Sequence, residues 1–294
     1  LVEPILSGGV HDLFILGTTG EAPSLSYRLR YELVELVCRQ VNQRVPVFVG
    51  ITDTSFSESV GLARWAAEKG AYALVVAPPY YLPMAQSELL EYFSRLAPAV
   101  PLPLVLYNMP GCTKVKIEPD TVQQVAEIPG ILGLKDSSGE MLYFTKVKYL
   151  MQRKPEFHLL IGPEELLAES LWVGGNGGVC GGANMFPRLY VDLYNAFNTC
   201  NQNEVQRLHQ IILQISTTIY SVGKHSSAII KGIKCVLNLL GICEDFMAEP
   251  FHRFHKPQRE ILQGYLDTIV ANHGQQITTM WTHNSINNNR PSKE

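Results

Sequence analysis

The stretch ILGLKDSSG, residues 131–139, is an apolar run that ends in a lysine and a polar turn. Its apolar residues do not alternate with polar ones, which is typical of a strand in a parallel sheet covered on both faces. A lysine that closes such a strand is drawn away from bulk water, and desolvation favours the neutral amine that attacks carbonyl carbons. Lys135 is therefore a candidate Schiff-base nucleophile. The alternative is a lysine that only extends its side chain into solvent.

Six similar runs flank this one, and longer stretches with helical spacing of apolar residues separate them. This alternation predicts βα units around a parallel sheet. We expect an α/β fold of the (β/α)8 TIM-barrel type rather than a Rossmann sheet, because no Gly-x-Gly-x-x-Gly follows a strand. Seven units are one short of eight, so we expect the first strand to be lacking from this chain, through truncation or an unusual gene start. The predicted strands are residues 13–17, 45–50, 73–78, 103–108, 131–136, 157–162 and 177–182.

The chain divides by composition into three parts. Residues 1–200 carry the predicted barrel, and residues 201–270 form a C-terminal extension with three predicted helices. Residues 271–294 are polar and rich in asparagine, so we expect a disordered tail there.

Composition favours small-molecule chemistry in the cytoplasm. The 294 residues are 46% hydrophobic, the formal net charge is -3, and no extended basic run suggests nucleic acid or an anionic membrane. The sequence has no apolar run of 18 residues, so no membrane span is predicted. The six cysteines lack a Cys-x-x-Cys pair and are expected to be reduced thiols. His252 and His255 have no third ligand nearby in sequence, so we predict no metal site.

Polar residues follow the predicted strands, and in a barrel these strand ends meet around the active site. Gly17, Thr18 and Thr19 belong to a GTTGE turn whose hydroxyls and N–H groups suit the binding of a small carboxylate. The alternative is that this sequence forms only an ordinary tight turn with a helix cap. The other residues at strand ends are Glu21, Thr52, Asp53, Tyr80, Tyr81, Tyr107, Asn108, Lys135, Glu164, Glu165 and Asn184.

Tyr107 and a glycine-dense stretch complete the candidate site. Tyr107 ends its strand one βα unit before Lys135, so its phenol can shuttle protons at the same cavity, or only fill the barrel mouth. The glycine-dense stretch is residues 174–182, which include Cys180 and Gly181. Its glycines let the backbone approach a ligand closely, or are needed only because the last strand is crowded.

Residues 17–21, 79–81, 107–110 and 133–136 together resemble the dihydrodipicolinate synthase and N-acetylneuraminate lyase superfamily, over roughly residues 1–270. The resemblance implies a class I pyruvate-dependent lyase in which Lys135 forms the imine and Tyr107 moves protons. Thr18 and Thr19 would hold the pyruvate carboxylate. Tyr81 would come from a neighbouring subunit or complete a hydroxyl relay with Thr18. The resemblance also implies a homotetramer, a dimer of dimers. An iminium is itself the electron sink, so no cofactor is expected.

Two departures from the superfamily patterns bear on the aldehyde substrate. The synthase pattern has an arginine two residues after the proline of its Tyr-Asn-x-Pro motif, where it binds the carboxylate of the aldehyde substrate. This chain has Cys112 there, and cysteine cannot make the bidentate contact. Glu164 and Glu165 stand where neuraminate lyases have acidic residues for a polyhydroxylated tail, although they also suit a first helical turn.

We therefore predict an aldolase that reversibly cleaves a 2-keto-3-deoxy sugar acid of the N-acetylneuraminate or ketodeoxygluconate type to pyruvate and an aldehyde. The alternatives are 4-hydroxy-2-oxoglutarate aldolase, 4-hydroxy-tetrahydrodipicolinate (dihydrodipicolinate) synthase, and a catalytically silent paralogue that binds a keto acid or has a structural role.

Overall fold

The computed structural model describes residues 1–277 and divides into two compact units. One unit is His11–Cys180, and the other combines Leu1–Val10 with the chain from Gly181 onward. The division at residue 180 differs from the predicted boundary at residue 200, and the predicted domain limits stay a prediction.

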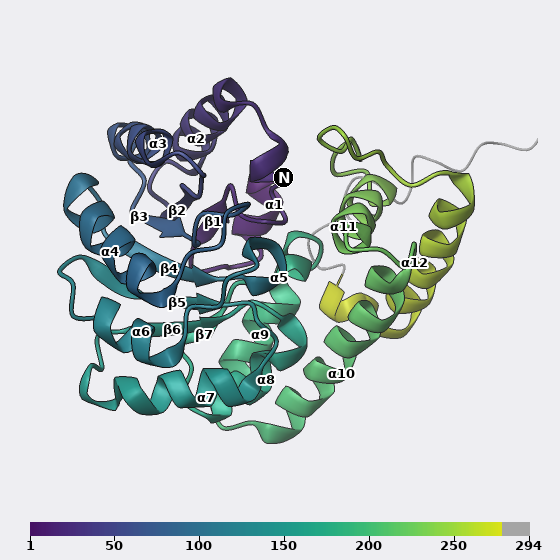
Figure 1. The fold of residues 1–294 in the computed structure, drawn as a ribbon. Coiled ribbons are helices and arrows are strands. Elements are labelled where there is room, and N and C mark those ends of the chain that lie inside the picture. The colour runs from purple at the N-terminus through teal and green to yellow at the C-terminus, as the bar shows by residue number, and fades with distance from the viewer. Residues whose placement is uncertain (278–294) are drawn as a thin grey trace, which may run out of the picture. The chain divides into compact units, whose positions relative to one another are not determined.

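The His11–Cys180 unit holds a seven-stranded parallel sheet whose strands follow sequence order (Figure 1). The predicted α/β barrel architecture is confirmed, with β1 and β7 at the two ends of the sheet. The strands are β1 Leu13–Ile15, β2 Val47–Gly50, β3 Ala73–Val76, β4 Leu104–Asn108, β5 Ile131–Asp136, β6 His158–Ile161 and β7 Gly177–Gly178.

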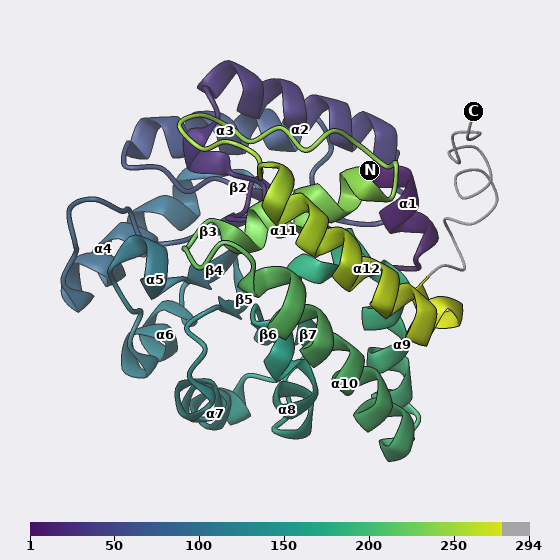
Figure 2. The same cartoon turned by 90° about the vertical axis from the view of Figure 1, so that its right-hand side faces the viewer.

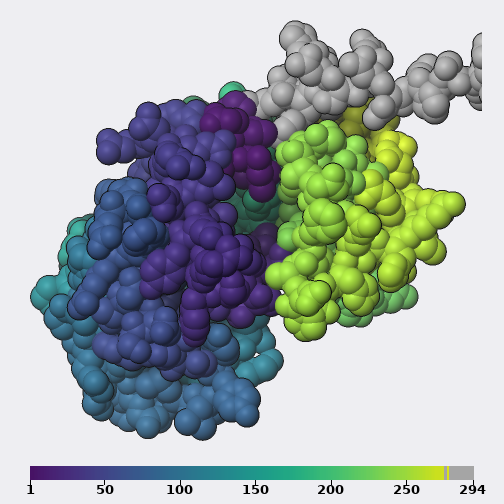
Figure 3. All heavy atoms as spheres, turned by 90° about the horizontal axis from the view of Figure 1, so that it is seen from above, coloured from purple at the N-terminus to yellow at the C-terminus, as the bar shows by residue number. Residues whose placement is uncertain are grey.

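Helices follow the strands and cover the outer side of the sheet. α2 begins after Ser26, whose hydroxyl accepts from the N–H of Leu29, and ends at Asn42 with a positive φ of 48°. Figure 3 shows the first half of this unit, in purple and blue, as a closely packed surface. The helices are α2 Tyr27–Val41, α3 Phe56–Glu68, α4 Gln86–Leu96, α5 Pro110–Thr113, α6 Pro119–Val125, α7 Met141–Leu150 and α8 Leu167–Trp172.

The second unit is helical, and the three predicted helices of the C-terminal extension are present as α10, α11 and α12. Figure 2 shows α12 crossing α11 and α10, and both contact it. The helices are α1 Val2–Ser7, α9 Pro187–Asn198, α10 Gln202–Thr218, α11 Ala228–Leu239 and α12 Lys256–Ile277.

Most predicted strands are one or two residues too long at an end, and two predicted boundaries differ more. The strand predicted over residues 177–182 covers only Gly177–Gly178, because the chain turns into a 3-10 helix at Gly181–Asn184. The tail predicted from residue 271 continues as α12 to Ile277, with a kink at His273 (φ -133°), and Ile277 is 4% exposed. The rest of the predicted tail, residues 278–294, lies outside the described residues.

The register between β4 and β5 brings the candidate catalytic residues together. Tyr107 is the register partner of Lys135, and Asn108 is the partner of Asp136. Tyr107 packs with Val75 and Val105 on one side of the sheet. Because successive strand residues point to opposite faces, Asn108 and Asp136 lie on the other side.

Gly133 in β5 is expected to be intolerant of a side chain. A Cβ there would lie 2.1 Å from the backbone oxygen of His158 in β6, so the two strands would have to separate. Gly133→Ala is expected to lower the free energy of unfolding by about 2 kcal/mol, which urea titration measures. Gly111→Ala is the matched control, because a Cβ at Gly111 meets nothing within 4 Å. Equal stability of the two variants would contradict the prediction.

Candidate active site

The GTTGE turn is built by a sharp reversal after β1. Leu16 is buried at 4% exposure with a φ of 57°, a conformation that leucine adopts only under constraint. Gly17 is required because a Cβ there would lie 2.7 Å from the ring of Phe14. The hydroxyl of Thr18 lies 3.1 Å from the hydroxyl of Tyr107. Thr19 is half-buried in the same turn.

Lys135 is a buried amine among aromatic rings. It is 7% exposed, and its Nζ lies 4.2 Å from the ring centroid of Tyr107 and 4.9 Å from that of Phe14. The two rings meet edge to face, with centroids 6.1 Å apart. Within residues 1–277 this Nζ has no hydrogen bond and no ion pair. The alternative of a lysine extended into solvent is therefore excluded.

Acidic residues after β6 and Lys135 both interact electrostatically with Cys180. Glu164 and Glu165 begin a 3-10 helix, Glu164–Leu166, so they occupy a first helical turn, and Glu164 is also 3% exposed. Burial raises the pKa of the Cys180 thiol well above its usual value, and the charge of Glu164 adds to this rise while Lys135 opposes it. Cys180 thus stays a neutral thiol in a neighbourhood that it shares with both groups.

Crowding accounts for part of the glycine-dense stretch. A Cβ at Gly178 would lie 2.7 Å from Leu167 and 2.9 Å from the sulfur of Cys180. A Cβ at Gly175 would lie 2.8 Å from the backbone oxygen of Ser170. Gly181 begins the 3-10 helix of the other unit, and its substrate-binding role stays a prediction.

Tyr81 and Cys112 do not join Lys135. Tyr81 is 96% exposed with a φ of 79°, and the Thr18 hydroxyl lies within hydrogen-bond distance of Tyr107, so the relay with Thr18 stays a prediction. The neighbouring-subunit role of Tyr81 stays a prediction. Cys112 is exposed on α5, and desolvation raises the pKa of its thiol.

Sequence reasoning missed three residues that support the site. Phe14 flanks Lys135, and alternation along β1 was the only available signal. Asp136 lies behind Lys135 and bonds to Asn108. Arg30 of α2 forms a 2.8 Å ion pair with Asp53, both buried, and donates to the backbone oxygen of Leu25 beyond the GTTGE turn.

Other kinds of site find no support in the described residues. Within residues 1–277, no three His, Cys, Asp or Glu side chains gather as metal ligands would. No helix in the same part of the chain is long and apolar enough to cross a membrane.

A parallel α/β barrel sheet with a buried lysine over a tyrosine ring at its strand ends is typical of class I, Schiff-base aldolases. Comparison with known proteins agrees. The model of the dihydrodipicolinate synthetase family matches residues 1–269, and the chain belongs to this family. It is accordingly a pyruvate-dependent lyase whose chemistry proceeds through a lysine imine without a separate cofactor.

Relatives span nearly the whole chain. The 4-hydroxy-tetrahydrodipicolinate synthase of Methanopyrus kandleri is 31% identical over 269 residues, 91% of this chain and 87% of the relative. The structure of dihydrodipicolinate synthase from Bacteroides thetaiotaomicron is 53% identical with a TM-score of 0.88, covering 91% of this chain and 90% of that chain. YagE of Escherichia coli, a prophage protein of the dihydrodipicolinic acid synthase family in complex with pyruvate, is 27% identical with a TM-score of 0.87 and the same coverage.

Proposed function

We propose that Lys135 forms the imine with pyruvate and that the enzyme makes or breaks a carbon–carbon bond between pyruvate and an aldehyde. One observation carries this proposal. The Nζ of Lys135 lies 4.2 Å from the Tyr107 ring, whose hydroxyl is 3.1 Å from Thr18. A nucleophile and a proton-transfer chain therefore share one buried space.

The proposed reaction begins when the neutral amine of Lys135 attacks the keto carbon of pyruvate. Tyr107, relayed by Thr18, delivers a proton to the carbinolamine oxygen, which leaves as water and gives the iminium. Tyr107, now without its proton, takes up a methyl proton to give the enamine, which attacks the aldehyde carbon while the aldehyde oxygen receives that proton. Water then hydrolyses the new iminium and releases the product and the free lysine. Cleavage is the same sequence reversed.

The GTTGE turn suits the pyruvate carboxylate. The backbone N–H groups of Thr18 and Thr19 donate to no acceptor within the described residues. With the Thr19 hydroxyl they can donate to a carboxylate, and Thr18 is linked to Lys135 through Tyr107, which both contact. We propose this as the carboxylate site.

Two reactions are candidates, and each has its own support. The comparisons favour aspartate-semialdehyde, because the curated relatives are 4-hydroxy-tetrahydrodipicolinate synthases. They support this alternative better than our prediction of a sugar-acid aldolase. The sugar-acid reaction stays a second candidate because Cys112 is exposed where the synthase pattern has an arginine, and the buried carboxylate of Glu164 disfavours a second acid group.

A substrate panel separates these candidates. Pyruvate is combined with aspartate-semialdehyde, and N-acetylneuraminate, ketodeoxygluconate and 4-hydroxy-2-oxoglutarate are tested for pyruvate release. We expect turnover of at least one, with the semialdehyde selecting the synthase and a sugar acid selecting the aldolase. Turnover of none by folded enzyme would contradict the proposal and favour the catalytically silent alternative.

Cys112→Arg tests the carboxylate argument directly. We expect the arginine to raise kcat/KM for aspartate-semialdehyde about tenfold or more through a charge-assisted fork, with no gain for a sugar acid. Cys112→Ala is the control and is expected to change neither value by more than about twofold, because it removes a neutral thiol. A wild-type synthase that Cys112→Arg fails to improve would show that another residue binds this carboxylate.

We also propose a cytoplasmic enzyme that associates through Tyr81. The six free cysteines support the cytoplasm. Tyr81 is 96% exposed and Leu82 77% exposed, which supports their burial in a neighbouring subunit. The predicted homotetramer remains a proposal, because a family member at 25% identity and a TM-score of 0.84 is described as a monomeric variant.

A further inference from the structure

Two buried polar residues lie directly behind the catalytic pair. Asn108 follows Tyr107 at the end of β4, and Asp136 follows Lys135 at the end of β5. Both are 0% exposed, and they are register partners. Since strand side chains alternate, Asn108 and Asp136 lie on the helix side of the sheet while their neighbours face the site.

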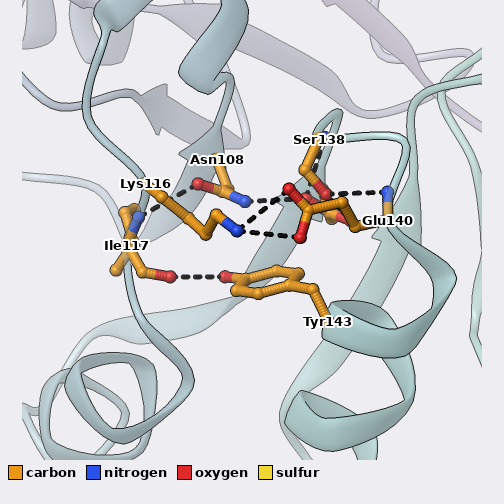
Figure 4. A network of polar contacts seen from close by, with 7 residues as sticks. Asn108, Lys116, Ile117, Ser138, Glu140 and Tyr143 are labelled. Atoms are coloured by element: carbon orange, nitrogen blue, oxygen red, sulfur yellow. Dashed lines mark hydrogen bonds and ion pairs between the residues drawn. The ribbon is translucent and has the colours of Figure 1, made fainter.

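The pair is bonded to each other and to both following loops. The amide of Asn108 donates to Asp136 over 2.8 Å, and its oxygen accepts from the backbone N–H of Ile117. Asp136 also accepts from the backbone N–H and the hydroxyl of Ser138, each over 3.0 Å. These contacts tie the ends of β4 and β5 to the loops that leave them (Figure 4).

The surrounding charges form a second layer. Lys116 pairs with Glu140 over 2.8 Å, and Tyr143 donates to the backbone oxygen of Ile117 over 2.7 Å. Burial raises the pKa of Asp136, the bonds from Asn108 and Ser138 lower it, and the charge of Glu140 raises it. Lys116, Glu118, Glu140 and Tyr143 are the titratable groups of this layer that interact with Asp136 or with one another around it.

We propose that Asn108 and Asp136 are positioning residues that hold β4 and β5 in the register at which Tyr107 and Lys135 act together. This inference rests on the proposed function of Lys135. Neither residue touches substrate, and the pair acts through the backbone of its neighbours. A misplacement of about 1 Å at a reacting centre costs on the order of 10²-fold in rate, so a loosened pair is expected to slow imine formation rather than pyruvate binding.

Asn108→Asp tests this with a pH signature. The variant sets two carboxyls at hydrogen-bond distance, and they separate unless one holds a proton. At pH 8 we expect pyruvate-imine formation, measured as borohydride-trapped adduct against time, to be about 10²-fold slower than wild type. The deficit relative to wild type is expected to shrink as pH falls to 5.5, because protonation restores one O–H···O bond. A loss of packing alone predicts no such recovery.

Three further variants complete the test. Asp136→Asn keeps the shape, and its amide oxygen still accepts from Asn108, so a rate within about fivefold of wild type is expected. Asn108→Asp with Asp136→Asn removes the like charges, and we expect most of the pH-8 rate to return without acid dependence. Asn108→Ser loses the bond without repulsion and is expected to be about tenfold slow at every pH. It provides the test if Asn108→Asp does not fold.

The outcomes are distinguishable. Circular dichroism melts at each pH establish that every variant is folded when it is assayed. Wild type that forms no adduct contradicts the proposed function itself. Wild type that forms the adduct while folded Asn108→Asp or Asn108→Ser matches it at all pH values overturns the positioning role. A pH-independent loss in Asn108→Asp that the double variant fails to restore overturns it equally.

Discussion

Lys135→Arg is expected to abolish turnover, lowering kcat/KM roughly 10⁴-fold or more. A guanidinium keeps its proton at every accessible pH, so it has no lone pair with which to attack the keto carbon. The larger planar group must also fit between the rings of Phe14 and Tyr107, where Nζ lies 4.9 Å and 4.2 Å from their centroids. The measurement is steady-state kinetics with pyruvate and the preferred aldehyde.

Lys146→Arg is the matched control for this variant. Lys146 is exposed on α7, so arginine there is expected to leave kcat/KM within about twofold. Thermal melts show whether Lys135→Arg remains folded. Folded Lys135→Arg with a tenth or more of wild-type activity would mean that another group is the nucleophile.

Tyr107→Phe is expected to lower kcat about 10²- to 10³-fold, with a small change in KM for pyruvate. Phenylalanine keeps the ring that packs on Phe14 at 6.1 Å and faces Lys135. It removes only the hydroxyl that lies 3.1 Å from Thr18, so formation and collapse of the carbinolamine lose their proton donor. Single-turnover kinetics of imine formation locate the loss at this step.

Variants of Thr18 serve as controls for the same proton path. Thr18→Ser keeps a hydroxyl and is expected to retain most of the activity, whereas Thr18→Val breaks the relay and is expected to approach Tyr107→Phe. If Tyr107→Phe lies within threefold of wild type, the tyrosine only fills the barrel mouth.

The sequence predicts the sheet and the proximity of three residues at its strand ends. Apolar runs without alternation mark the seven strands, and the rule that strand ends meet brings Thr18, Tyr107 and Lys135 together without tertiary information. Thr18 and Tyr107 are 89 residues apart in sequence, and that rule explains why their hydroxyls lie close together.

What the sequence could not predict depends on packing between elements. The bond from Asn108 to Asp136 joins residues 28 apart, and its existence follows from the β4–β5 register rather than from either local pattern. The buried ion pair of Arg30 and Asp53 cannot be predicted from the sequence either, because an arginine in a helical pattern is expected to be exposed.

Local sequence is also silent on the direction of loops and on helix ends. A tyrosine at position 81 is compatible with a loop that turns toward Lys135 and with one that turns away. The structure shows that the Tyr81 side chain is 96% exposed. The asparagine-rich composition after residue 270 does not indicate that Ile277, at the end of α12, is buried.

Trapping of the imine tests the central claim most directly. Wild-type enzyme is incubated with pyruvate and sodium borohydride, digested, and mapped by mass spectrometry. We predict a single carboxyethyl group on the Nζ of Lys135, absent without pyruvate and absent in Lys135→Arg. Folded enzyme that gives no adduct, or an adduct on another lysine, would contradict the account.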